Sequence, residues 1–178
     1  MIKRLLSLGV LALSACTSPD VQLYAHARPK LDLPAFFDGK TDAWGMFQKR
    51  SGEVARRFHV DIDGSSNEAG VLKLEERFQY DDGSTQQRVW RLTRQPDGRW
   101  QGYADDVKGS AAGEVAGNAL RWQYTLLLPV DGKTYEMQFD DWMFLIDECT
   151  MINRASMRKF GVEFGQVTLM FRKRSCAR

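Results

Sequence analysis

Histidine is scarce in this sequence, and its scarcity limits the chemistry that the chain can perform. Only two histidines occur in 178 residues, His26 in an expected linker and His59 in an expected strand. Ser-His-Asp relays and most zinc sites depend on histidine. Glycine-rich phosphate-binding motifs and the G-x-S-x-G motif are also missing. We therefore expect no catalytic residue, no metal site and no cofactor.

A surplus of charge of either sign is lacking as well. Lysine and arginine total 25, and aspartate and glutamate total 23. If residues 1–15 are removed, Lys3 and Arg4 go with them, and 25 − 2 = 23 basic residues face 23 acidic ones. A nucleic-acid partner needs a basic face, so we expect none. Beyond residue 15 no apolar run approaches the ~20 residues that span a membrane.

Residues 1–16, MIKRLLSLGVLALSAC, contain the clearest motif. Two basic residues precede an apolar run from Leu5 to Leu13, and small residues lead to Cys16, which is the layout of a secretory signal peptide. The last four residues resemble a bacterial lipobox, in which the cysteine is lipidated (palmitate among its acyl chains). We expect a signal peptide over 1–15 and a membrane anchor at Cys16. Thr17 in place of aspartate is typical of the periplasmic face of the outer membrane. An incidental cysteine after a cleaved signal is the alternative.

Two cysteines, Cys149 and Cys176, remain once Cys16 is assigned to lipidation. In an oxidising compartment they could form a disulfide. Cys176, however, lies in a short tail, residues 175–178, that we expect to be mobile. The sequence leaves both states open.

The rest of the chain alternates short strand-like runs with turn dipeptides such as Asp82-Gly83 and Asp97-Gly98. Residues 16–33 have little periodicity and are expected to be a lipidated tether, and residues 34–174 a single domain. The pattern predicts an all-β fold, an antiparallel up-and-down, lipocalin-like barrel of about eight strands whose first strand is 53–62. Residues 139–161 could form a helix instead, but their β-branched and aromatic content favours strands.

Register follows from placing apolar residues on one face. A three-residue loop at 81–83 or 96–98 and a two-residue turn at 131–132 keep the faces together, whereas the turn at 147–148 lacks glycine. The first strand's register is free, and its parity permits Arg56 beside Glu76. The predicted pairs are Leu72 with Leu92, Leu74 with Trp90, Glu76 with Arg88, Leu92 with Gly102, Trp90 with Ala104, Arg88 with Asp106, Leu128 with Tyr135, Leu126 with Met137, Tyr124 with Phe139, Trp122 with Asp141, and Asp141 with Arg154.

These registers predict an inward row of charges. Glu76, Asp106 and Asp141 would form a polar belt with three arginines, because unpaired charges inside a barrel are costly. Trp122 would donate its indole N–H to Asp141. The belt could simply fill the barrel, or one arginine, Arg154 first, could bind a ligand carboxylate. The candidate ligand-binding residues are Arg154, Arg88, Arg56, Trp90, Trp122, Tyr124, Leu126 and Met137.

Several strings resemble one family: FFDGKTDAWGMF, RRFHVDIDG, RVWRLTR, GEVAGNALRWQY and DDWMFLIDECTMINRASMRKFG. With the lipobox, they are similar to the bacterial lipoproteins grouped as domain of unknown function 3833, over about residues 33–172. The resemblance implies a cell-envelope lipoprotein, in the frequent company of genes for lipid modification, and carries over no catalytic residue. A looser similarity to lipocalins rests on Gly39 and Trp44, which are five apart rather than two.

Together these observations predict an outer-membrane-anchored lipoprotein that binds or ferries a fatty-acid-like or other amphipathic ligand. A structural or accessory lipoprotein with a filled barrel is the alternative, and a lipid-modifying enzyme the third. A cavity of several hundred Å³ would distinguish the first from the second.

Overall fold

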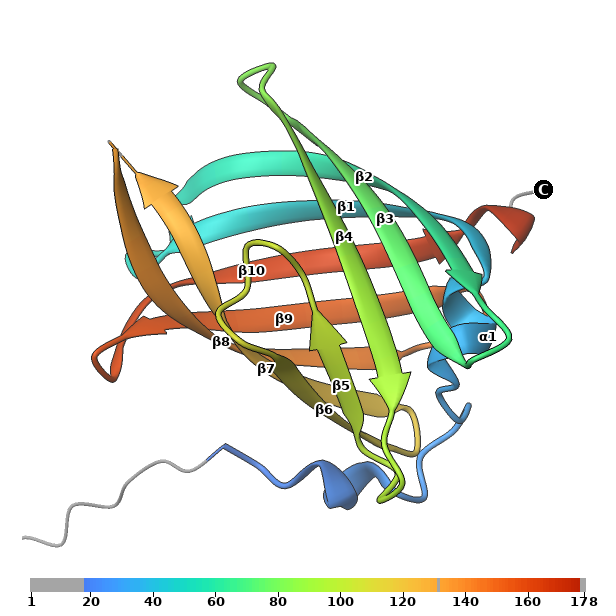
Figure 1. Ribbon diagram of the computed structural model, residues 1–178. Helices are drawn as coiled ribbons and strands as arrows, with labels where there is room; N and C mark the ends of the chain where they lie inside the picture. The colour runs from blue at the N-terminus through green and yellow to red at the C-terminus, as the bar shows by residue number, and fades with distance from the viewer. Residues whose placement is uncertain (1–17, 131, 177–178) are drawn as a thin grey trace, which may run out of the picture.

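The fold is a closed antiparallel barrel, seen in a computed structural model that describes residues 18–130 and 132–176 (Figure 1). The expected signal peptide, Cys16 and Asp131 lie outside these residues. Around the barrel the strands follow the order β1-β10-β9-β8-β7-β6-β5-β4-β3-β2. Their bounds are β1 Gly39–Lys49, β2 Val54–Ser66, β3 Val71–Tyr80, β4 Thr85–Arg94, β5 Trp100–Tyr103, β6 Ala111–Ala116, β7 Ala119–Val130, β8 Lys133–Leu145, β9 Thr150–Lys159 and β10 Val162–Lys173.

The all-β antiparallel class is confirmed, but the barrel has ten strands where about eight were predicted. The strand that the sequence analysis missed, β1, precedes the expected first strand and pairs with both β2 and β10. It presents Thr41, Ala43 and Gly45 to the interior before its first large inward residue, Phe47, so the apolar alternation that marks a strand is weak. No helix in the described part of the chain is long and apolar enough to cross a membrane.

Hairpins that contain a turn glycine have the predicted registers. Gly83 has a φ of 81°, the left-handed conformation that a three-residue loop requires. In the β3–β4, β4–β5 and β7–β8 ladders, the confirmed pairs are Leu72 with Leu92, Leu74 with Trp90, Glu76 with Arg88, Leu92 with Gly102, Leu128 with Tyr135, Leu126 with Met137, Tyr124 with Phe139 and Trp122 with Asp141. The β4–β5 ladder ends at Arg91 and Tyr103, so the expected pairings of Trp90 with Ala104 and Arg88 with Asp106 are not ladder pairs.

The predicted β8–β9 register is wrong by one residue. The amide of Ile146 donates to the carbonyl of Thr150, so the loop has three residues rather than two. Asp141 therefore lies opposite Ala155, and Arg154 lies opposite Trp142. A slip of one residue turns a side chain to the other face of the sheet. Arg154 accordingly lies outside, exposed and bonded to Gln166, although residues 139–161 do form strands as favoured.

The suggested neighbourhood of Arg56 and Glu76 is also wrong. In the β2–β3 ladder Glu76 lies opposite Ile62, well along the strand from Arg56. The sequence of the loop between β2 and β3 has no pattern that predicts this register. Arg56 instead lies near the β3–β4 loop, where it contacts Asp82 and Ser84.

One end of the barrel is closed by α1 (Leu33–Phe37), at the right of Figure 1. Asp32 caps this helix by accepting a hydrogen bond from the amide of Ala35 at 3.0 Å. Leu33, Phe36 and Phe37 are buried. A side chain at Gly64 would place its Cβ 1.8 Å from the carbonyl oxygen of Phe37, so only glycine permits this close approach.

The described part of the expected tether packs against the outside of the barrel. Its 3-10 helix η1 (Val21–Tyr24) buries Val21, and the Tyr24 ring lies 5.1 Å from the Phe144 ring, centroid to centroid. The amide of Leu31 also donates to the carbonyl of Gly117. This segment is therefore part of the folded unit.

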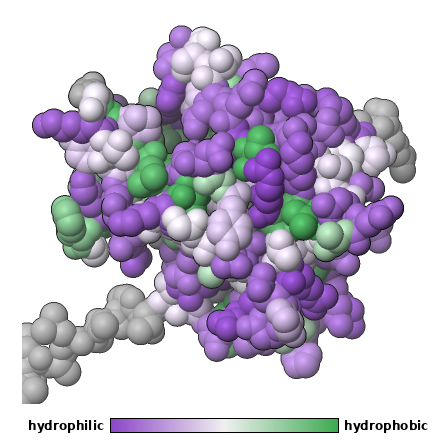
Figure 2. Space-filling view, in the orientation of Figure 1, coloured by the Kyte–Doolittle hydropathy of each residue, from purple (hydrophilic) through white to green (hydrophobic). Residues whose placement is uncertain are grey.

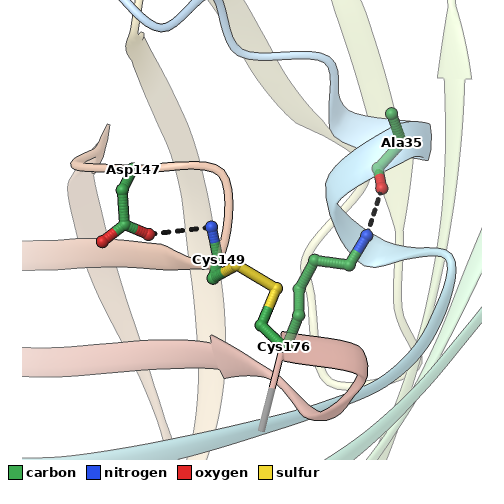
Figure 3. Close-up of a disulfide and its surroundings, with 5 residues drawn as sticks. Ala35, Asp147, Cys149 and Cys176 are labelled. Atoms are coloured by element: carbon green, nitrogen blue, oxygen red, sulfur yellow. Dashed lines mark hydrogen bonds between the residues drawn. A yellow bond between two sulfur atoms is a disulfide. The ribbon is translucent and has the colours of Figure 1, made fainter. Parts of the chain in front are cut away.

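A disulfide joins Cys149, in the β8–β9 loop, to Cys176, in the 3-10 helix η2 (Arg174–Cys176) that follows β10 (Figure 3). Asp147 accepts a hydrogen bond from the amide of Cys149 at 2.8 Å. Lys173 donates to the carbonyl of Ala35 in α1 at 2.6 Å. These contacts hold the C-terminal segment against the closed end.

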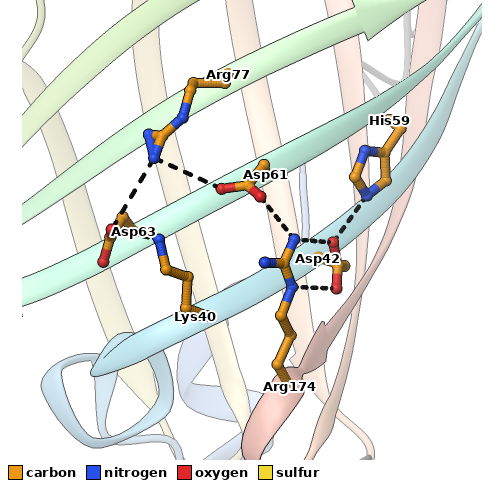
Figure 4. A network of polar contacts seen from close by, with 7 residues as sticks. All are labelled: Lys40, Asp42, His59, Asp61, Asp63, Arg77 and Arg174. Atoms are coloured by element: carbon orange, nitrogen blue, oxygen red, sulfur yellow. Dashed lines mark hydrogen bonds and ion pairs between the residues drawn. The ribbon is translucent and has the colours of Figure 1, made fainter.

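The outer face of β1, β2 and β3 carries a network of paired charges (Figure 4). Arg174 donates to Asp42 at 2.7 Å and to Asp61 at 2.6 Å, and the hydrogen bond from Arg174 lowers the pKa of Asp42 to about 2. His59 contacts the same Asp42 carboxylate at 2.8 Å. Hydrophilic side chains cover most of the face seen in Figure 2, as expected for alternating strands with a water-facing side.

Candidate ligand cavity

The barrel encloses a cavity of about 790 Å³ between α1 and the rim at the opposite end. Glycines help to leave this space open. A Cβ at Gly113 would lie 2.1 Å from the Trp122 ring, and one at Gly102 would lie 2.5 Å from it, so the indole lies flat against β5 and β6. This large side chain thereby stays at the wall.

Most of the predicted ligand-binding residues line this cavity. They are Arg56, Arg88, Trp90, Trp122, Tyr124 and Leu126. Met137 is buried in the surrounding core but does not line the cavity, and Arg154 is outside. The registers of the glycine-containing hairpins account for all of these lining residues except Arg56, which comes from β2.

Aromatic rings form much of the apolar wall. Trp90 lies 5.8 Å from Trp122 and 5.5 Å from Tyr124, both edge to face, and Tyr124 stacks on Phe139 at 4.9 Å. Such arrangements are favourable for aromatic pairs. Towards the rim, Phe58 and Phe78 extend this surface, although the sequence analysis did not select them. Phe58 and Phe78 occupy inward positions in the alternating patterns of β2 and β3, and this alternation could have identified them.

Arg88 is the centre of the polar part of the wall. Its Nε donates to Asp106 Oδ1 at 3.0 Å and its Nη2 donates to Oδ2 at 2.7 Å, a bidentate geometry. Its Nη1 lies 3.8 Å from Glu76 Oε2. Burial works against the charge of Arg88, but the two carboxylates raise its pKa above the usual value. Glu76, Arg88 and Asp106 thus lie together, although Arg88 and Asp106 are not a ladder pair.

Glu76 is a buried carboxyl group with a raised pKa. Its side chain is 13% exposed and lines the cavity. Burial raises its pKa to about 7 against the opposing effect of Arg88, and the carboxylates of Asp106 and Asp141 add to the increase. The group therefore changes its charge near neutral pH.

Asp141 lies on the same wall, where burial raises its pKa to about 6 although its hydrogen bonds oppose the increase. It accepts a hydrogen bond from Asn153 Nδ2, and Tyr124 Oη donates to it at 3.5 Å. These are its hydrogen-bond donors among the described residues, so the predicted indole donor, Trp122, is a ladder neighbour only. The wrong β8–β9 register is the reason that Asn153 was missed.

Arg56 lies at the rim and is already paired. It donates to Asp82 at 2.9 Å and to Ser84 at 2.5 Å, and its guanidinium carbon lies 3.5 Å from the centre of the Tyr80 ring. Its buried Nε has no hydrogen-bond partner among the described residues.

Fold and site together define a ten-stranded antiparallel β-barrel with an internal, largely apolar cavity. The chain belongs to the DUF3833 family, described as protein of unknown function, which matches residues 10–173. The expected membership of this family is thereby confirmed. Comparison with curated proteins gives no match.

The chain is also similar in structure to a protein of unknown function from the DUF3598 family of Nostoc punctiforme PCC 73102. The TM-score is 0.50 at 12% sequence identity, and the match covers 89% of this chain and 53% of that protein. The chain therefore spans about half the length of that protein. At this identity the likeness concerns the fold alone.

Proposed function

We propose that this protein binds an amphipathic ligand whose apolar part occupies the barrel cavity. The observation that carries the proposal is the cavity of about 790 Å³, which lies within the range of small-molecule sites. A filled barrel, as the accessory alternative expects, would have no such space. The closed end at α1 and the aromatic wall favour a ligand that enters from the rim with its apolar part inside.

The cellular setting is part of the same proposal. Residues 1–16 support secretion and lipidation at Cys16, and Thr17 supports the periplasmic face of the outer membrane. A protein held there by acyl chains would be close to a supply of amphipathic molecules. Acyl-chain mass on the N-terminal peptide, found by mass spectrometry of protein from its native envelope, would support this anchoring, and an unmodified cysteine would contradict it.

Calorimetric titration with linear alcohols from hexanol to decanol tests the binding itself. Each added CH₂ contributes about 0.8 kcal/mol when buried, so affinity should rise about fourfold per carbon. Leu126→Trp places a large ring at the cavity wall and should weaken decanol binding by at least about tenfold. Thr125→Trp, on the outward face of the same strand, is the matched control and should bind as the parent does.

Two results would contradict the proposal. One is the absence of chain-length dependence, because surface adsorption does not require a cavity. The other is equal binding by the Leu126→Trp and Thr125→Trp variants. Native mass spectrometry of the purified protein provides an independent measurement, since a bound amphipathic molecule should be released together with the folded chain.

A further inference from the structure

The polar wall of the cavity has more acidic than basic groups. Besides Arg56 at the rim and Asp105, the cavity is lined by three carboxyl groups, those of Glu76, Asp106 and Asp141, which lie around the guanidinium of Arg88. They come from β3, the β5–β6 connection and β8, while Arg88 comes from β4. Tyr124 on β7 and Asn153 on β9 complete the wall with neutral groups. If all the carboxyl groups are ionised, the charged residues that line the cavity have a net charge of −2, since 2 − 4 = −2.

Arg88 has little left to offer a ligand carboxylate. Its Nε and Nη2 are both committed to Asp106, and its Nη1 points towards Glu76. A fatty-acid carboxylate placed here would also meet three carboxyl groups of the same charge. Because like charges repel strongly where water is excluded, the expected arginine–carboxylate contact has no suitable place at this wall.

Glu76 is, by contrast, an acceptor without a donor. It takes part in no side-chain hydrogen bond within residues 18–130 and 132–176, and its only charged contact is Arg88 at 3.8 Å. A buried acceptor normally has a hydrogen-bond partner. Its position on the cavity wall means that a bound molecule could supply that partner.

Resting on the proposed function, we infer that the ligand's head group is a cationic hydrogen-bond donor of the alkylammonium type, which lies against Glu76 and Asp141. An ammonium group donates up to three hydrogen bonds and accepts none. It would satisfy Glu76 and reduce the excess negative charge of the wall. The apolar chain would then extend along Trp90 and Tyr124 towards the rim.

Three probes with one chain length and different head groups test this inference: decylamine, decanol and decanoate, titrated at pH 8. Decylamine should bind at least tenfold more tightly than decanol, and decanoate more weakly than decanol. Between pH 5 and pH 8, decylamine affinity should rise as Glu76 ionises, while decanol affinity should remain nearly constant, since an alkylamine keeps its proton over this range.

Glu76→Gln should remove most of the preference for decylamine, so that the ratio of decylamine to decanol affinity falls towards one. Its matched control is Glu75→Gln, because Glu75 is the preceding residue of β3, faces outward and pairs with Lys73 at 2.6 Å. This control should keep the parent's preference. Asp141→Asn provides a second variant, which should reduce the preference if Glu76→Gln fails to fold.

The outcomes separate this inference from the proposed function. Equal binding of all three probes, tightest binding of decanoate, or an unchanged preference in Glu76→Gln would overturn the cationic head group while chain binding stands. Failure of every probe to bind would overturn the proposed function, and this inference with it.

Discussion

At the scale of single residues, Arg88 and Arg154 show that the contribution of a charged side chain to stability depends on where it lies. Arg88 is 14% exposed and holds Asp106 in a bidentate contact inside the barrel. Arg154 is exposed and bonds only to the amide oxygen of Gln166 among the described residues. Loss of a buried partner leaves the other charge unpaired, whereas loss of a surface contact exposes it to water.

Replacing each arginine with methionine should therefore give very different results. Arg88→Met should lower the free energy of unfolding by about 3 to 5 kcal/mol, because the buried Glu76 and the partly buried Asp106 lose their cation. Arg154→Met should change it by less than about 1 kcal/mol. Urea denaturation at pH 7 measures both, and similar losses in the two variants would show that the interior contact is not the stronger one.

Glu76 should make stability depend on pH. The folded-state pKa of Glu76, about 7, lies above the ordinary value of 4.5. At pH values between these two, Glu76 is protonated in the folded protein and ionised in the unfolded chain. The free energy of unfolding should thus fall as pH rises from about 4.5 to about 7. The free energy of unfolding of Glu76→Gln, measured relative to that of the parent, should therefore increase by about 3 kcal/mol from pH 4 to pH 8.

Denaturation curves at several pH values measure this gain, with Glu75→Gln as the control. The pKa of Glu75 is lowered by its hydrogen bond from Lys73, so its replacement should give no such gain. A pH-independent difference between the parent and Glu76→Gln would indicate that Glu76 is not the titrating group.

The charged residues of the wall and the pairing of Glu76 with Arg88 were predictable from the sequence, but the partner of Asp141 was not. Alternation in β3 and β4 placed Glu76 beside Arg88, because each hairpin face had to be uniformly apolar around them. Asn153 could not be selected, since a one-residue change of register decides whether Asn153 or Arg154 faces inward. Because Asn153 faces inward in place of Arg154, the wall has one cation fewer than predicted and an excess of acidic groups.

At the scale of elements, the hairpin loops explain which ladders could be deduced. Gly83 and Gly98 have positive φ angles and mark three-residue loops unambiguously. The β8–β9 loop also has three residues, but Asp147 supports it through a hydrogen bond to the Cys149 amide, and no glycine marks its length. The strand β1 was missed for a different reason, because small and polar residues face the interior there.

The seating of α1 depends on a backbone contact with β2. Gly64→Ala should lower the free energy of unfolding by about 1 to 3 kcal/mol, because the added methyl group overlaps the Phe37 carbonyl. Ser66→Ala, at the exposed end of the same strand, should have little effect. Thermal denaturation measures both variants, and unchanged stability in Gly64→Ala would mean that α1 can shift at little cost.

At the scale of the whole molecule, the disulfide between Cys149 and Cys176 crosslinks positions 27 residues apart. Closing a loop of this length in the unfolded chain corresponds to about 3 to 4 kcal/mol in the chain-entropy treatment. Reduction should lower the free energy of unfolding by about that amount. In a Cys149→Ser/Cys176→Ser variant, which should have the stability of the reduced parent, the reductant should have no effect.

This comparison uses denaturant titrations with and without reductant. Equal stability of oxidised and reduced protein would indicate that α1 and the Arg174 contacts alone hold the C-terminal segment. If the serine variant loses more free energy of unfolding than the parent does on reduction, the sulfur atoms also contribute through packing.

Closure of the barrel between β1 and β10 also governs the order of folding events. Thr41 pairs with Lys173, so these edges can meet only when almost the whole barrel sequence is available. Contacts between distant parts of a chain carry a large loop-closure entropy and slow folding. Until they form, β1 and β10 are unpaired edges to which another chain can add. The time spent as an open sheet, more than the stability of the closed barrel, should therefore govern aggregation.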